Sequence, residues 1–167
     1  MKRIYFLRRK ITNYLKKEQL LKDEEYLKLE KPYLTKARKN FTVANILIEI
    51  SDKDELKKIL KLSTDFEMFD WVIIVAYYAM YTSALAALSK LGFKSKSHAA
   101  TLTILEYHYV HQEKGLEIKH LHKLSKAHQL SEDLINKLIQ IKTKRETAQY
   151  DATPSISREN AKSALED

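Results

Sequence analysis

An arginine lies at the end of an otherwise apolar helical stripe late in the sequence. In SEDLINKLIQIKTKRETAQY, residues spaced four and three apart share one helical face, namely Leu134, Leu138, Ile141, Arg145 and Ala148. An arginine that faces a protein interior needs acceptors, because an unpaired buried charge is costly. Asp151, a tyrosine hydroxyl or a ligand phosphate would suit its planar guanidinium. The alternative is a fraying last turn that lets the side chain reach water.

A histidine lies at the expected start of another helix. In SHAATLTILEYHYV, one helical face carries His98, Leu102, Leu105 and Tyr109. The imidazole of His98 would then point toward the interior or a subunit contact. Because the positive helix end disfavours imidazolium, we expect a neutral group that can both donate and accept. The alternative is a buried histidine whose nitrogens are satisfied by a carbonyl or a tyrosine hydroxyl.

The other histidines give little indication of a metal site. His108 and His111 lie one helical turn apart and could share an ion, but the chain has no cysteine. Neither histidine belongs to an HExxH or ExxH pattern, which would place a carboxylate beside it. We therefore expect a solvated pair, and neither a metal nor another cofactor.

The composition predicts an all-α protein. The chain has 167 residues, about one domain, with only two glycines and two prolines. This scarcity argues against a turn-rich β-protein and excludes Rossmann and Walker A phosphate loops. Two pairs fit the capping box that begins a helix, Ser51 with Asp54 and Thr64 with Glu67. We expect helices near 3–30, 33–50, 52–62, 65–91, 97–113, 117–128, 131–149 and 157–165.

An uncharged stretch, WVIIVAYYAMYTSALAALS, runs from Trp71 to Ser89 and reaches the length of a membrane span. One face is bulky and comprises Trp71, Ile74, Tyr78, Tyr81, Leu85 and Leu88. Another is small and comprises Ala76, Ala79, Ser83 and Ala86. Two such faces suit the centre of a helical bundle, where neighbours approach at different distances. We favour a central helix over a membrane span.

The positive charge is concentrated in the first part of the chain. Residues 1–40 contain 13 Lys and Arg against 5 Asp and Glu, and the remaining residues balance. We expect a basic amphipathic leader helix over 1–31, followed by a helical bundle over 32–167. Such a segment attracts phosphate polymers or acidic lipids; the alternative is a solvated helix packed on the body. It lacks the apolar centre of a secretory signal, so we expect a cytoplasmic protein.

Several segments together resemble the HEPN domain, and in particular the small archaeal and bacterial toxin–antitoxin type with a YYAM-like central helix. They are Asp70-Trp71, Ala76 through Tyr81, Ala84 through Leu88, Gly92, Ser97-His98, Arg145 and Tyr150-Asp151. The resemblance covers roughly residues 33–165. It implies a compact up-and-down bundle of four or five helices, commonly paired as a homodimer.

The resemblance also implies chemistry on RNA. Many family members are metal-independent ribonucleases that use an arginine and a later histidine with four to six residues between them. The arginine stabilises the phosphorane formed by ribose hydroxyl attack, and the histidine handles a proton. Arg145 matches the arginine, but Tyr150, Asp151 and Ala152 occupy the histidine window. A tyrosine phenol is almost wholly protonated at neutral pH, so we expect ribonuclease action to be weakened or lost.

The candidate site therefore comprises Arg145, Tyr150, Asp151 and His98, with RNA as ligand. A second hypothesis is a non-catalytic partner of a minimal nucleotidyltransferase, which in related systems modifies a tyrosine near the motif; Tyr150 would be that residue. A third is an internal ion pair between Arg145 and Asp151 that only fixes a loop.

Overall fold

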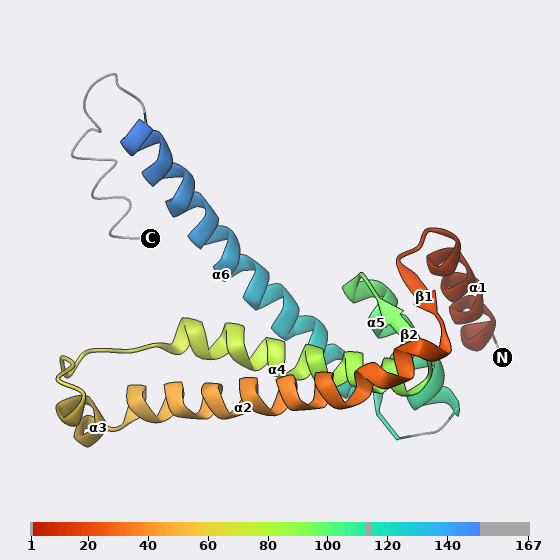
Figure 1. The fold of residues 1–167 in the computed structure, drawn as a ribbon, viewed down its shortest axis with the longest axis horizontal. Helices are drawn as coiled ribbons and strands as arrows, with labels where there is room; N and C mark the ends of the chain where they lie inside the picture. Colours follow the sequence, from red (N-terminus) through yellow and green to blue (C-terminus); the bar gives the residue numbers. More distant parts are fainter. Residues whose placement is uncertain (1, 113–114, 151–167) are drawn as a thin grey trace.

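Two long antiparallel helices, α2 (Glu30–Asp52) and α4 (Phe69–Lys90), form the most extensive contact between described elements (Figure 1). The structure is a computed structural model that describes residues 2–112 and 115–150, with described side chains ending at residue 140 and leaving out residue 138. Within these residues the only β-structure is a two-stranded sheet. The all-α prediction is therefore confirmed.

The short helix α3 (Asp54–Ile59) closes the far end of the α2–α4 hairpin (Figure 1). The Ser51 hydroxyl donates to the Leu47 carbonyl and accepts from the Met68 amide, at 2.9 Å each. The buried Lys57 ammonium donates to the Thr64 carbonyl at 2.8 Å. The capping box predicted at Ser51 is wrong, because this residue is still inside α2 and uses its hydroxyl to hold the start of α4.

The hydrophobic core lies at the opposite end of the hairpin. There the second half of α4 meets the strands β1 (Leu20–Lys22) and β2 (Phe93–Ser95), α5 (His98–Leu105), a π-helical turn η2 (Glu106–Gln112) and the start of α6 (Ile118–Tyr150). The core side chains are Leu20, Tyr77, Ala84, Leu88, Phe93, Ala100, Ile104, Leu105, Leu121 and Leu124. This cluster fixes where the histidines of α5 and α6 can meet.

The predicted leader helix over 1–31 is wrong in extent. Helix α1 spans Lys2–Lys16 and ends where Glu18 adopts a left-handed φ of 52°. The chain then forms β1, which pairs antiparallel with β2, and a 3-10 helix η1 (Glu24–Leu29). Gly92, at φ 73°, makes this pairing possible because a Cβ there would lie 3.3 Å from the Asp23 carbonyl oxygen. Long-range strand pairing thus overrides the local helical pattern.

The helices predicted at 117–128 and 131–149 are one continuous helix, α6. Neither glycine nor proline lies between Ile118 and Tyr150 to interrupt it. Ser131, which we expected near a helix start, is completely buried within α6. After this contact with the body, α6 diverges from α4 and extends away from it (Figure 1).

Helix α4 combines core and exposed residues. It is the one helix among the described residues long and apolar enough to cross a membrane, and 44% of its most apolar window is buried inside the protein. Ile74 and Leu88 are buried, as are the small residues Ala79 and Ala86. Trp71 and Tyr78, at the hairpin end, are exposed. The bulky stripe is therefore only partly covered inside the protein.

Candidate functional site

The predicted site residues lie in two separate places. Arg145 and Tyr150 belong to the last two turns of α6, and His98 is the first residue of α5. Asp151 lies outside the described residues, as do the side chains of Arg145 and Tyr150. The structure therefore fixes the backbone position of the arginine and tyrosine and the full environment of His98.

His98 stacks on a second histidine, His128, which comes from α6. The two imidazole rings are 3.9 Å apart, centroid to centroid, with their planes inclined by 20°. Tyr81 stacks against His98 with centroids 5.7 Å apart, and Tyr77 lies 5.3 Å from the His128 ring. Four aromatic rings from three helices thus join α4, α5 and α6 at the edge of the core.

The stack contains buried nitrogen atoms without hydrogen bonds. Among the described residues, neither Nδ1 nor Nε2 of His98 has a partner, and Nδ1 of His128 has none. His128 Nε2 lies 3.3 Å from a Glu132 carboxylate oxygen. The alternative of a His98 satisfied by a carbonyl or a tyrosine hydroxyl thus finds no support in the described residues.

Burial keeps His98 neutral. Two effects lower the pKa of His98 to about 4: the larger is the loss of solvent on burial, and the smaller is repulsion from His128. The neutral state expected from the sequence is therefore confirmed, but its main cause is burial and not the helix end to which we attributed it. At that helix end, the Ser97 hydroxyl caps α5 by accepting a hydrogen bond from the Ala100 amide. Burial, and then neighbouring Tyr81, Tyr78 and Glu132, likewise raises the pKa of Tyr77.

Within one chain, His98 and Arg145 are far apart. His98 packs on His128, which precedes Arg145 by 17 positions in the same continuous helix. At a rise of 1.5 Å per residue, this corresponds to about 25 Å along α6. Proton transfer requires groups within about 3 Å of the reacting atoms. The structure therefore does not bring His98 to the arginine of the same chain.

His128 is the residue of this cluster to which we assigned no role. Its spacing contained a signal, because Leu121, Leu124, His128 and Ser131 follow a three, four, three pattern along α6. The first two and the last are buried, and all four pack toward the body. Periodicity thus placed His128 on the inner face, but only the structure shows that its partner is His98.

The π-helical turn η2 uses its histidines locally. His111 Nε2 lies 3.5 Å from a Glu106 oxygen, and Glu106 also accepts from Arg3. The His108 ring lies edge-on to Tyr107, with centroids 4.9 Å apart. In the described part of the chain, no three His, Asp or Glu side chains are grouped so that they could hold a metal ion.

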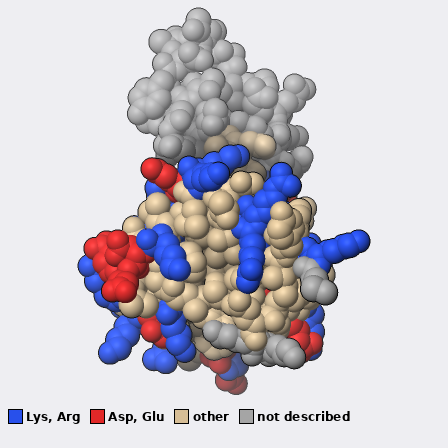
Figure 2. Space-filling model, turned by 90° about the vertical axis from the view of Figure 1, so that its right-hand side faces the viewer, with Lys and Arg blue, Asp and Glu red and all other residues tan. Residues whose placement is uncertain are grey.

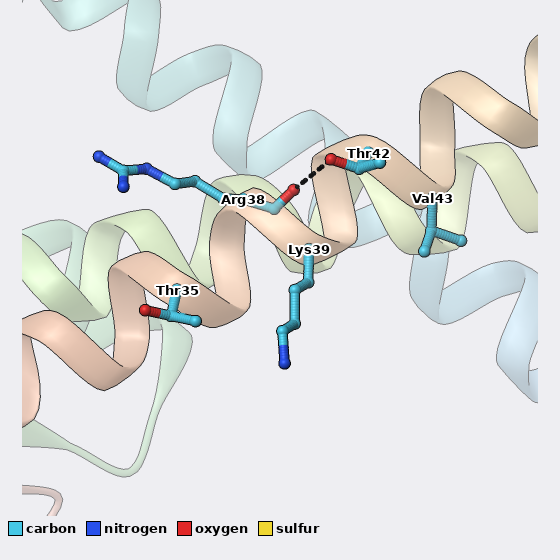
Figure 3. A pocket seen from close by; sticks show the side chains of 5 residues that line it. All are labelled: Thr35, Arg38, Lys39, Thr42 and Val43. Atoms are coloured by element: carbon cyan, nitrogen blue, oxygen red, sulfur yellow. Dashed lines mark hydrogen bonds between the residues drawn. The ribbon is translucent and has the colours of Figure 1, made fainter.

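Helix α2 has a shallow hollow on its outer surface that contains two cations (Figure 3). Its lining consists of Thr35, Arg38, Lys39, Thr42 and Val43. Figure 3 shows Arg38 and Lys39 extending in different directions, so they do not converge on one anion. A second hollow, between α2 and α4, is lined mainly by apolar side chains including Phe41 and Met80. Neither arrangement resembles a catalytic centre.

The comparison with protein families gives one match. A family model described as "HEPN domain" matches residues 31–167. No curated protein and no solved structure matches the chain. The matched range begins at the start of α2 and includes the histidine stack as well as the Arg145 end of α6.

Proposed function

The chain belongs to the HEPN domain family, and we propose that it is an RNA-binding member of toxin–antitoxin type with a weakened, metal-independent ribonuclease activity. The observation that carries this proposal is the continuity of α6, which puts Arg145 and Tyr150 on one helical segment beyond the core. A phosphate of single-stranded RNA is the ligand that a guanidinium in this position suits best. The proposed location is the cytoplasm, with α4 as a core helix.

Arg145 would bind the scissile phosphate and stabilise the charge that develops on it. Within one chain, the proton would then have to be handled by Tyr150 or Asp151, because the His98 of that chain lies about 25 Å away along α6. A phenol and an ordinary carboxylate are both poor proton acceptors at neutral pH. Activity well below that of a histidine-containing site follows from this arrangement.

A homodimer is part of the proposal. The Trp71 side chain is 51% exposed, and Tyr78 on α4 and Ile139 on α6 are exposed as well. These apolar side chains line helices that diverge from one another (Figure 1), and a second copy would cover them. Light scattering should give twice the chain mass, and Trp71→Ser should shift it toward one chain. A wild-type protein of single-chain mass would contradict the dimer.

The catalytic proposal is tested by incubating single-stranded RNA with the protein in EDTA. We expect slow cleavage that falls by about 10²- to 10³-fold in Arg145→Ala, because removal of one transition-state donor has that effect. Arg145→Lys should recover only part of the activity, since lysine lacks the planar fork. The matched control is Arg38→Ala, which removes an exposed arginine on α2; this variant should cleave RNA as the wild type does. Intact RNA with the wild-type protein would remove the catalytic part of the proposal.

The alternative function is a partner module of a minimal nucleotidyltransferase. It is favoured by the position of Tyr150, the last residue of α6, at the end of the helix that is directed away from the core (Figure 1). This alternative predicts that a nucleotidyltransferase encoded beside the gene adds a nucleotide to Tyr150. Mass spectrometry of the co-expressed pair should then show the adduct on the wild type and lose it in Tyr150→Phe. An unmodified wild-type protein would contradict the alternative.

A further inference from the structure

Helix α1 is attached to the body by one face only. Leu7 is 1% exposed, and Ile11 and Tyr14 pack against the core cluster. At one side of this face, Arg3 donates two hydrogen bonds to the Glu106 carboxylate, at 2.6 and 2.7 Å. At the other side, Arg8 donates to the Tyr107 hydroxyl at 2.8 Å. These contacts fix the rotation of α1, so its opposite face is held outward.

The outward face carries cations and an aromatic ring. Lys2, Tyr5, Arg9 and Lys16 are spaced three, four and seven apart, which places them along one side of a helix about 21 Å long. All four are exposed, and Tyr5, at 73%, is the most exposed aromatic side chain of the described residues. Residues 2–17 include seven Lys and Arg and no Asp or Glu.

Phe6 holds a further cation beside this row. The Lys10 ammonium lies 4.8 Å from the centre of the Phe6 ring, and the Arg3 guanidinium lies 5.6 Å from it. A cation over an aromatic face is attracted by the ring quadrupole. Figure 2, which views this end of the molecule, shows Lys and Arg side chains distributed over a largely uncharged surface, with Asp and Glu mainly at its left and lower edges. The surface would therefore attract a polyanion.

We propose that the outer face of α1 binds single-stranded RNA, with a base stacked on Tyr5 and phosphates held by Lys2, Arg9, Lys10 and Lys16. The inference deepens the proposed RNA-binding function and rests on it. Base stacking on an exposed aromatic ring combined with backbone contacts from cations is the general basis of single-strand binding. A duplex offers the phosphates but not an unstacked base. Single strands should therefore bind more tightly.

An acidic membrane is the other ligand that a basic helix attracts, but the packing of α1 disfavours it. A helix that lies on a bilayer buries a broad apolar face in the acyl boundary. In α1 that face, which includes Leu7 and Ile11, is occupied by contact with the body. The exposed large apolar side chains of α1 are Tyr5, Phe6 and, nine positions further along the helix, Leu15. The docked helix thus offers a stacking residue rather than a membrane-inserting face.

Fluorescence anisotropy with labelled oligouridine, at several NaCl concentrations, separates the two parts of the site. Tyr5→Ala should weaken binding by about fivefold or more, from lost stacking, and leave the salt slope unchanged. Arg9→Glu with Lys16→Glu should lower the magnitude of the slope by about 1.4, because each single-strand phosphate contact contributes about 0.7. These side chains are exposed, so the circular dichroism spectrum should stay that of the wild type.

Matched controls lie elsewhere on the molecule. Phe41→Ala removes an exposed ring on α2, and Lys58→Glu with Lys61→Glu reverses two exposed charges at the hairpin tip, at the opposite end from α1 (Figure 1). Both controls should bind as the wild type does. Equal losses in controls and α1 variants would overturn the proposal.

The outcome also separates this inference from the proposed function. If the wild-type protein binds and cleaves RNA while the α1 variants bind normally, α1 is not the surface and the proposed function stands. If wild-type protein binds no RNA, both fail. If it binds phosphatidylserine vesicles but not oligouridine, and Tyr5→Ala abolishes vesicle binding, the membrane interpretation replaces the RNA surface.

Discussion

The stacked pair of His98 and His128 predicts an acid-sensitive fold. The folded state holds His98 neutral down to a pKa of about 4, whereas an unfolded histidine titrates near 6.5. Between these values the unfolded chain binds a proton that the folded chain does not. Stability that is fully present above pH 6.5 is therefore lost as the pH falls toward 4.

The expected loss follows from the size of this shift. A difference of about 2.5 pH units corresponds to at most about 3.4 kcal/mol, and about 2 kcal/mol of that would be lost by pH 5. The residue is only partly buried, so solvent screening reduces the effect. We therefore expect about 1 kcal/mol of unfolding free energy to be lost between pH 7 and pH 5 through His98 alone.

His98→Phe isolates this contribution. The substitution keeps an aromatic ring stacked on His128, removes the titrating group and eliminates two buried nitrogens that lack partners. At pH 7 we expect equal or higher stability, because replacing an unsatisfied polar group by an apolar one of similar shape is neutral or stabilising. Urea unfolding at pH 7, 6 and 5, followed by circular dichroism, should show a shallower decline for the variant.

Groups near the pair do not obscure this comparison. The titratable side chains that face it are Tyr77, Tyr81 and Glu132, in addition to His128, and they are present in both proteins. Stability curves that run parallel from pH 7 to pH 5 would refute the reasoning. So would a large loss at pH 7, which would show that the His98 nitrogens have a partner.

Two further predictions concern the attachment of the leader segment. Arg3→Ala leaves the largely buried Glu106 carboxylate without its guanidinium, and that contact holds the carboxylate's pKa below its usual value. We therefore expect the unfolding free energy at pH 7 to fall by about 1–3 kcal/mol. Hydrogen–deuterium mass spectrometry should show faster amide exchange in α1. Unchanged exchange would show that α1 does not depend on the contact. Gly92→Ala forces a residue with a side chain into a left-handed conformation against the Asp23 carbonyl. We expect the unfolding free energy to fall by about 1 kcal/mol or more, with a lower Tm in thermal unfolding. Equal Tm values would contradict the strained geometry.

The sequence predicted the class of the fold better than its boundaries. Helical periodicity and the scarcity of glycine and proline depend on local chemistry, and the all-α class follows from them. The end of α1 depends instead on pairing between residues near 20 and residues near 95, which no local pattern contains. Ser51 likewise looked like a helix start, but its hydroxyl serves a distant amide, Met68. Contacts remote in sequence decided these boundaries.

The candidate site was predictable to a similar degree. The inward position of His98 follows from its periodicity, and burial accounts for its neutral state. Its partner His128 shared an apolar stripe with Leu124, but a stripe does not identify what lies opposite. The separation of His98 from Arg145 was hidden for another reason, since it depends on α6 being one helix rather than two. The predicted role of Arg145 as a phosphate ligand stays a prediction.

The length of α6 links the two proposals for RNA. Arg145 is 27 positions beyond Ile118, the first residue of α6, which corresponds to about 40 Å along that helix. Helix α1, in contrast, contacts α5 and η2, near the start of α6. Phosphates held on α1 are therefore different from the phosphate held by Arg145 of the same chain, and only an RNA long enough to span the molecule could occupy both sites. Because the two proposed sites use different residues, substitutions can affect RNA binding and RNA cleavage separately. Substitutions on α1 should raise the RNA concentration needed for half-maximal cleavage, whereas Arg145→Ala should lower the cleavage rate by about 10²- to 10³-fold and leave most of the affinity.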